Sequence, residues 1–171
     1  MLKVASRYGF QSQNVNDIWG LRYFLDEGEV FDVELEQDVL KANREIAQEN
    51  RTLLQKHGVK AIDIMGAIGA GKTSLIEKLV DRLKSRYRIA AFKGDLTTTI
   101  DAEKISRHNV QVVAINTGKE CHLDANLVRK AFQKLSLDSI DLLLIENVGN
   151  LICPAEFPLG SEKRIVIISV T

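Results

Sequence analysis

A glycine-rich run that ends in a lysine and two hydroxyl residues carries the clearest chemistry in this chain. It reads Gly66-Ala67-Ile68-Gly69-Ala70-Gly71-Lys72-Thr73-Ser74, and residues 66–73 fit the pattern G-x-x-x-x-G-K-[ST] at every fixed position. In this pattern main-chain N–H groups surround phosphate oxygens, the lysine reaches the β- and γ-phosphates, and the hydroxyl ligates Mg²⁺. We therefore expect this run to bind a nucleotide.

Acidic residues that follow two expected strands supply the next part of such a site. Asp95 comes after the expected strand Arg88–Lys93, and Glu146 ends a strongly apolar run. With the Thr73 hydroxyl, these two carboxylates are expected to hold Mg²⁺ or a water molecule around it. Gly149 would let its N–H approach the γ-phosphate. Asp101 either joins this group or caps a helix, for which aspartate is a favoured residue. The expected catalytic residues are Lys72, Asp95, Asp101 and Glu146.

A second group of residues has metal-ligand chemistry. Cys121 and His122 follow the expected third strand, and Cys153 follows the fourth. Thiolate and imidazole suit Zn²⁺ and Ni²⁺, and three protein ligands leave one coordination position open, whereas a closed structural zinc site normally holds four. The alternative is that the two cysteines are inert, because free cysteines often behave as small apolar residues. Local sequence alone does not separate these two interpretations.

The elements that position these residues alternate between strands and helices. Strands are expected at Ala61–Met65, Arg88–Lys93, Val110–Ile115, Leu142–Glu146 and Arg164–Val170. Helices are expected at about Leu35–His57, from the glycine-rich run to Leu83, at Asp101–His108 and at Asp124–Leu135. This alternation predicts an α/β fold with a mainly parallel sheet flanked by helices on both faces, whose ligands bind at the carboxyl ends of the strands. We expect residues 1–33 to form a partly irregular N-terminal extension and residues 34–171 to form one domain.

The bulk composition limits the classes of partner. The chain has 171 residues with 23 basic and 23 acidic side chains, so no overall field favours nucleic acid or an acidic membrane surface. No segment approaches the roughly 18 apolar residues of a transmembrane helix, and a secretory signal is not recognisable. Two cysteines do not make a disulfide framework. We expect a cytoplasmic protein without nucleic-acid or membrane partners.

Four separate segments resemble the family of hydrogenase nickel-incorporation GTPases, HypB, over roughly residues 35–171. They read GAIGAGKTSLIEKL, GDLTTTIDAEKI, INTGKECHLDANLV and IENVGNLICPAEF. The resemblance implies a P-loop GTPase fold related to the urease nickel chaperone, with GTP or GDP, Mg²⁺, and Ni²⁺ or Zn²⁺ as ligands. It implies that Cys121, His122 and Cys153 hold nickel or zinc at the interface of a GTP-promoted homodimer. It also implies nickel delivery to [NiFe]-hydrogenase, with a maturation partner and the hydrogenase large subunit as partners.

The chain departs from this family in three places. Residues 1–33 contain no Cys or His, so the metal-loading segment of many relatives is not expected there. Asn126 stands where relatives often have a histidine. The base-reading element [NT]-K-x-D does not occur within 1–171, so guanine specificity is only implied, and we expect a C-terminal truncation.

The alternatives are a urease-type nickel chaperone, whose usual Cys-Pro-His motif differs from the adjacent Cys121 and His122, and a P-loop small-molecule kinase with incidental cysteines. A zinc-bridged structural dimer is disfavoured by the intact Lys72 and Thr73.

Overall fold

The computed structural model describes residues 29–95, 110–118 and 120–170, without the side chains of 29–36 and of residue 95. The chain divides into two compact units, Met1–Glu36 and Gln37–Thr171. Helix α2, Glu29–Lys56, crosses the boundary between them. Its start lies six residues before the expected Leu35, so residues 29–33 of the expected irregular extension are helical. No helix within the described ranges is long and apolar enough to cross a membrane.

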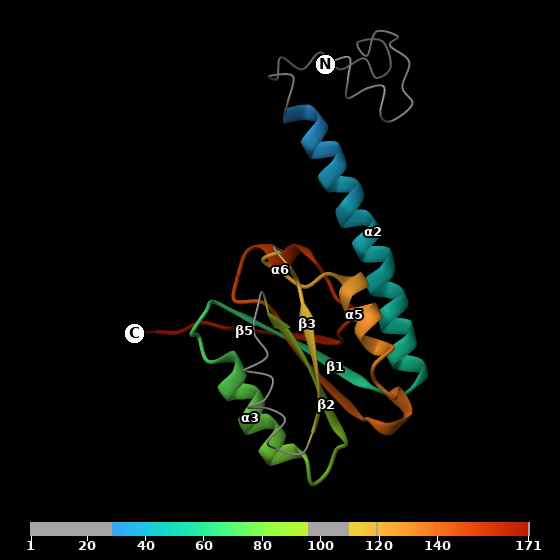
Figure 1. The fold of residues 1–171 in the computed structure, drawn as a ribbon, viewed down its shortest axis with the longest axis vertical. Coiled ribbons are helices and arrows are strands. Elements are labelled where there is room, and N and C mark those ends of the chain that lie inside the picture. Colours follow the sequence, from blue (N-terminus) through green and yellow to red (C-terminus); the bar gives the residue numbers. More distant parts are fainter. Residues whose placement is uncertain (1–28, 96–109, 119, 171) are drawn as a thin grey trace. The chain divides into compact units, whose positions relative to one another are not determined.

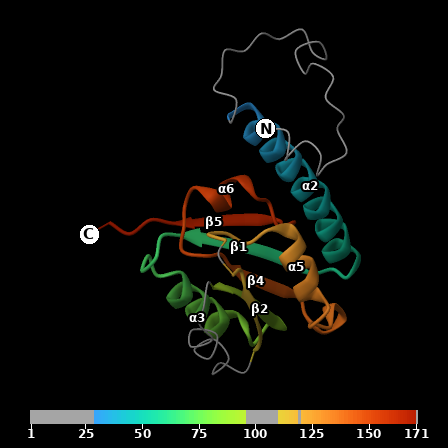
Figure 2. The same cartoon turned by 45° about the horizontal axis from the view of Figure 1, so that its top comes forward.

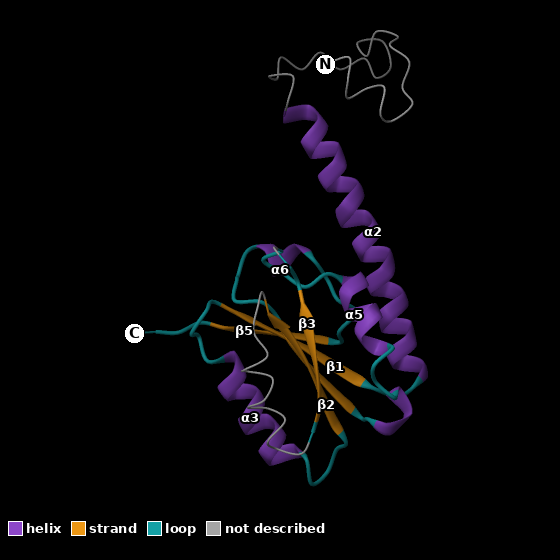
Figure 3. Cartoon of the chain, viewed as in Figure 1, coloured by secondary structure: helices purple, strands orange, loops and turns teal. Residues whose placement is uncertain are grey.

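The second unit is built on one five-stranded sheet in which every pair of neighbours is parallel. The strands of this sheet cross the middle of the unit in Figures 1 and 3. The spatial order is β3-β2-β4-β1-β5, so β1 and β4, which precede the glycine-rich run and Gly149, lie side by side, as labelled in Figure 2. Their bounds are β1 Lys60–Gly66, β2 Ile89–Asp95, β3 Gln111–Asn116, β4 Leu142–Glu146 and β5 Lys163–Ile167. The predicted parallel α/β fold is confirmed.

Helices cover both faces of this sheet, because successive strand residues point to opposite sides. In β4, Leu143 and Ile145 join the core beneath α2 and α5, Ala125–Phe132, whereas Leu142 and Leu144 join the core beneath α3, Lys72–Leu83. Figure 2 shows α3 on one side of the sheet and α5 with the last turns of α2 on the other. Since β4 is buried on both faces, its sequence is continuously apolar rather than alternating.

Several element bounds differ from those expected. Strand β2 includes Asp95, which was placed after the strand, and β5 ends at Ile167 rather than Val170. Two short elements were not anticipated: a 3₁₀ turn at Leu137–Ser139 and a four-residue helix, α6, at Cys153–Glu156. The expected helix Asp101–His108 lies outside the described residues. The expected and observed ends differ by a few residues because the ends of elements depend on tertiary contacts more than on apolar periodicity.

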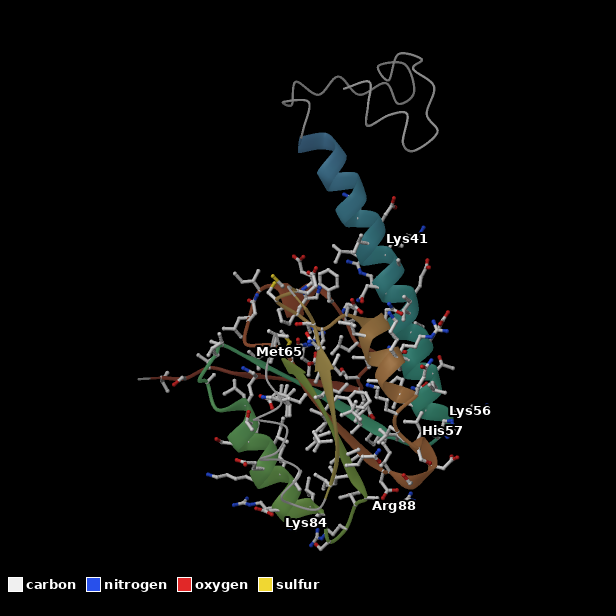
Figure 4. All side chains as sticks on the ribbon, viewed as in Figure 1. Lys41, Lys56, His57, Met65, Lys84 and Arg88 are labelled. Atoms are coloured by element: carbon white, nitrogen blue, oxygen red, sulfur yellow. The ribbon has the colours of Figure 1, made fainter. Side chains whose placement is uncertain are left out.

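Two buried asparagines fasten α2 to the loops on its side of the sheet. Asn43 accepts a hydrogen bond from the main-chain N of Ala125 and donates one to the carbonyl of Pro158. Asn50 donates to the carbonyls of Ala125 and Leu159. In Figure 4 the labelled Lys41 and Lys56 point from α2 into solvent, while Met65 of β1 lies inside. The buried face of α2 is thus hydrogen-bonded to two segments, one that precedes β4 in the sequence and one that follows it.

Candidate nucleotide and metal site

The glycine-rich run forms the turn between β1 and α3, as the motif predicts. Gly69 and Gly71 have φ angles of 78° and 95°, a left-handed conformation that glycine adopts without steric cost. The Lys72 side chain folds back over this turn, and its Nζ donates to the carbonyls of Gly66 and Ala67, each at 2.9 Å. Burial lowers the pKa of Lys72; Glu146 opposes the shift and Lys93 adds to it. The Lys72 ammonium group therefore lies over the turn whose main-chain N–H groups are expected to bind phosphate.

The segment after β4 lies directly on this turn. A Cβ atom added to Gly149 would come within 2.3 Å of Ile68 Cγ1 and 3.1 Å of the Ile68 main-chain N. An antiparallel bridge also pairs Gly66 with Asn150. Only a glycine allows this approach at position 149, so the structure brings Gly149 and the phosphate loop together as the sequence predicted. The residues next to Gly149 in the sequence do not by themselves specify its contact with Ile68.

Thr73 and Glu146 meet beneath the loop. The Thr73 hydroxyl donates to Glu146 Oε1 at 2.8 Å, and Glu146 is 2% exposed. Its other oxygen, Oε2, is buried and has no hydrogen-bond partner in the described part of the chain. A buried carboxylate oxygen without a partner carries a large desolvation cost that a cation relieves. Hydroxyl and carboxylate oxygens are the ligands Mg²⁺ prefers, so these two residues fit the expected magnesium site.

Lys93, which sequence reasoning did not assign, enters this cluster from β2. Its Nζ forms a buried ion pair with Glu146 Oε1 and donates to Thr73 Oγ1 at 3.1 Å. The ammonium group therefore bonds both groups expected to hold Mg²⁺. A lysine at the end of the apolar strand segment 89–92 was the only signal in the sequence. Of the other expected residues, Asp95 is the last residue of β2, with an undescribed side chain, and Asp101 lies outside the described residues.

The three expected metal ligands come together. One candidate ligand atom each from Cys121, His122 and Cys153 lies within 4.8 Å of the others, and all three residues are half-buried. Cys121 Sγ is 3.9 Å from His122 Nδ1. The neighbouring Cys121 thiol raises the pKa of Cys153, and loss of hydration adds to the rise. Two thiols this close compete for deprotonation, and a divalent cation would remove that competition.

Local chemistry fixes both segments that carry these ligands. The loop before Cys121 turns at Gly118, whose φ is 67°, and Asn116 Oδ1 accepts from the Gly118 N at 2.7 Å. After His122, Asp124 caps α5 by accepting from the Leu127 N at 2.7 Å. Cys153 is the first residue of α6, and Pro154 suits the first turn of a helix because its missing N–H is not needed there. The His122 ring lies over Phe157, with centroids 3.9 Å apart.

A polar network centred on the buried Asp63 was also not predicted from the sequence. Asn147, which follows Glu146, donates a hydrogen bond to Asp63 of β1, and Arg164 of β5 donates another to the same carboxylate. Asp63 is fully buried, and burial raises its pKa although Arg164 and Asn147 favour the charged form. An aspartate inside the apolar strand 61–65 was the available signal, because a buried charge needs a partner. Its partners are far away in sequence.

A glycine-rich turn between β1 and α3 of a parallel sheet, with a carboxylate at the tip of the neighbouring strand, defines a P-loop nucleotide-binding protein. The P-loop alone does not divide this class further, but the comparison with family models does. The chain belongs to the CobW/HypB/UreG family of nucleotide-binding domains, whose model matches residues 60–167.

Individual relatives confirm the resemblance to HypB. The chain is 60% identical over 139 residues to a probable hydrogenase maturation factor HypB from Methanocaldococcus jannaschii, covering 81% of this chain and 63% of that protein. The crystal structure of HypB from Archaeoglobus fulgidus matches with 45% identity and a TM-score of 0.68, covering 75% of this chain and 62% of the other. HypB from Helicobacter pylori, crystallised in complex with nickel, matches with 36% identity and a TM-score of 0.69, covering 73% and 59%. The chain thus spans about three fifths of each of these relatives.

Proposed function

We propose that this chain is the nucleotide- and metal-binding part of a GTP-hydrolysing metallochaperone that delivers nickel during [NiFe]-hydrogenase maturation. The main observation behind this proposal is that two cysteines and a histidine from two different segments meet within 4.8 Å, in a domain that also contains a P-loop. Membership of a family that contains nickel-bound HypB supports the proposal. The protein would act in the cytoplasm.

The nucleotide half of the proposal assigns a role to each part of the P-loop. The N–H groups of residues 66–74 would surround the phosphates, and Lys72 would leave the carbonyls of Gly66 and Ala67 to reach the β- and γ-phosphates. Thr73, Glu146 and Asp95 are the residues that would hold Mg²⁺, which neutralises charge on the phosphates when bound. Asp101 is proposed to help position the attacking water. The Gly149 N–H would contact the γ-phosphate and so distinguish GTP from GDP.

In the metal half, nickel is cargo rather than a resident cofactor. Cys121, His122 and Cys153 would bind Ni²⁺, or Zn²⁺ in its place, and the open coordination position would be filled across a homodimer interface or used for release. Cys153 lies four positions after Gly149, so rearrangement around the γ-phosphate would move one thiolate. GTP binding, dimerisation and metal affinity would then be linked reciprocally. The proposed recipients are a hydrogenase maturation partner and the hydrogenase large subunit.

A nickel titration of the reduced protein tests the central claim. Thiolate-to-nickel absorption is followed with and without Mg²⁺ and a non-hydrolysable GTP analogue, in the native chain and in Cys121→Ala. We expect a band that requires Cys121 and an affinity that changes with the analogue. A P-loop small-molecule kinase with incidental cysteines predicts no thiolate band, and a band that ignores the nucleotide would contradict the proposed coupling.

The role of the P-loop lysine in assembly needs a separate measurement. Lys72→Ala removes the charge that would bridge to the phosphates, so we expect it to abolish dimerisation driven by the GTP analogue. Sedimentation of the native chain and of the exposed-lysine control Lys78→Ala provides the comparison. Tight nucleotide-driven dimerisation of Lys72→Ala would refute this role.

A further inference from the structure

A continuous path of hydrogen bonds, buried at Asn147 and Asp63 and partly exposed at Arg164, joins the two segments that carry the metal ligands. It begins at the main-chain N of Leu123, one residue after His122, and passes through Asn147, Asp63 and Arg164. It ends at main-chain carbonyls in and just after α6, the helix that Cys153 begins. None of these three side chains is itself a candidate ligand of nickel or Mg²⁺ in the site described above.

Asn147 is the central residue of this hydrogen-bonded path. It is 1% exposed, its Oδ1 accepts from the N of Leu123 at 3.1 Å and of Val148 at 3.0 Å, and its Nδ2 donates to Asp63 Oδ1 at 3.1 Å. Its main-chain N donates to the carbonyl of Ile64 at 3.0 Å. The amide therefore uses both of its ends, and neither can move without breaking a buried hydrogen bond.

The second half of the hydrogen-bonded path runs from β1 to β5 and from there to the α6 segment. Asp63 Oδ2 accepts from Arg164 Nε at 3.0 Å. The same guanidinium donates to the carbonyl of Ala155 at 3.0 Å and to that of Phe157 at 3.4 Å. Phe157 in turn lies against the His122 ring. The path therefore ends on the segment that Cys153 begins, and the contact between Phe157 and His122 joins this end to the segment where the path starts.

This placement matters because metal affinity depends on groups that orient the ligands as well as on the ligands themselves. The Cys121–His122 loop and the Cys153 segment come from opposite sides of β4 in sequence, so no local turn fixes the distance between them. The hydrogen-bonded path supplies that constraint through the sheet. Its central residue directly follows Glu146, so a shift of Glu146 on binding nucleotide would be transmitted to Leu123 and to the neighbouring His122.

We propose that Asn147 and Asp63 are positioning residues that hold the Cys121–His122 and Cys153 segments at metal-binding distance and link that distance to the nucleotide site. The proposal rests on the proposed nickel site. It assigns the mechanical link to a side-chain amide and a carboxylate inside the domain, in addition to the covalent connection from Gly149 to Cys153.

The decisive experiment exchanges the two side chains. Asn147→Asp alone places two carboxyl groups in contact, and Asp63→Asn alone takes the charge from Arg164. In the double variant Asn147→Asp/Asp63→Asn, the new aspartate accepts from Leu123, Val148 and the new asparagine, whose oxygen accepts from Arg164. All the hydrogen bonds and the net charge are then restored. Asn126→Ala, at an exposed position in the first turn of α5, is the matched control.

Two readouts are measured on the full chain. One is nickel affinity from the thiolate-to-nickel band, with and without Mg²⁺ and the GTP analogue. The other is binding of phenylarsine oxide, whose arsenic forms bonds to two thiols with release of one water. Because Cys121 and Cys153 are the only cysteines in the sequence, this probe reports their separation without any nickel. Asn147→Ala removes the central amide of the path altogether. Arg164→Gln, on a partly exposed side chain, is a milder break of the same path and takes its place if Asn147→Ala fails to fold.

We expect Asn147→Ala and each single exchange to weaken nickel binding by about tenfold or more, the usual effect of removing a group that orients metal ligands. They should also weaken arsenical binding and reduce the effect of the GTP analogue. The double exchange should recover both affinities, and Asn126→Ala should match the native chain. Native-like affinities in the single variants, or a double exchange no better than either single one, would overturn the proposal. If the native chain shows no nickel band while arsenical binding follows the exchange pattern, the proposed function fails and the positioning roles stand.

Discussion

Replacing Lys93 by methionine tests whether a protein ammonium group occupies the place between Thr73 and Glu146. The substitution keeps an unbranched apolar stem of similar length and removes the charge. In the native structure Lys93 and Glu146 form an ion pair whose side chains are 6% and 2% exposed, and Glu146 Oε2 already lacks a partner among the described residues. Lys93→Met therefore leaves a buried carboxylate without its main cation.

The expected cost follows from that burial. Removing one partner of a buried pair destabilises a protein by about 3–5 kcal/mol. For a chain of this length, a loss of about 3 kcal/mol lowers the midpoint of thermal unfolding by roughly 6–12 °C. Mg²⁺ with nucleotide would return a cation to Glu146, so bound ligand should recover most of this loss. By linkage, the ligand-induced rise in the unfolding midpoint should be larger in Lys93→Met than in the native chain.

Thermal unfolding is recorded for the native chain, Lys93→Met and the control Lys78→Met, each with and without Mg²⁺ and GDP. Lys78 is an exposed lysine of α3, so its replacement should leave the midpoint nearly unchanged. If Lys93→Met unfolds at the same temperature as Lys78→Met in the absence of ligand, the ion pair does not hold Glu146. If the two variants gain equally from Mg²⁺ and GDP, the ammonium group does not compete for the magnesium ligands.

Three further perturbations address other parts of the structure. Gly149→Ala should weaken GDP binding at least about tenfold by pushing Ile68 and the phosphate loop aside, and adding Ile68→Ala, which removes the clashing atom, should recover part of it in a calorimetric titration. Arg88, by hydrogen bonding, lowers the pKa of Asp141 from 3.8 to about 2, so this carboxylate stabilises the fold above pH 3.8 and the contribution is lost as pH falls through 2. Urea unfolding of Asp141→Asn should accordingly lose that part of the acid dependence between about pH 4 and 2. Asn50→Ala, which removes two buried hydrogen bonds to the carbonyls of Ala125 and Leu159, should cost about 2 kcal/mol in urea unfolding, whereas the exposed Gln48→Ala should cost little.

The segments whose conformation is decided by nearby residues could be predicted from the sequence. The P-loop is such a case, because Gly69 and Gly71 supply the positive φ angles locally and the apolar spacing of α3 begins at once. The burial of β4 followed from its continuous apolar run. The meeting of Cys121, His122 and Cys153 was expected because parallel strands deliver their following loops to one edge of the sheet. Sequence also sufficed for the family, since four separated motifs agreed.

The polar contacts inside the domain were decided by the tertiary structure. Lys93 reaches Glu146 across 53 positions in sequence, and Asp63 is bonded by Asn147 and Arg164 across 84 and 101. These meetings depend on strand order and register: β4 lies between β2 and β1, with Lys93 opposite Glu146 and Asp63 opposite Arg164. A periodic pattern records which face a residue occupies but not which distant residue stands beside it. The sequence by itself therefore determined the phosphate loop, the family and the ligand types, whereas the structure decided which buried charges and amides connect them.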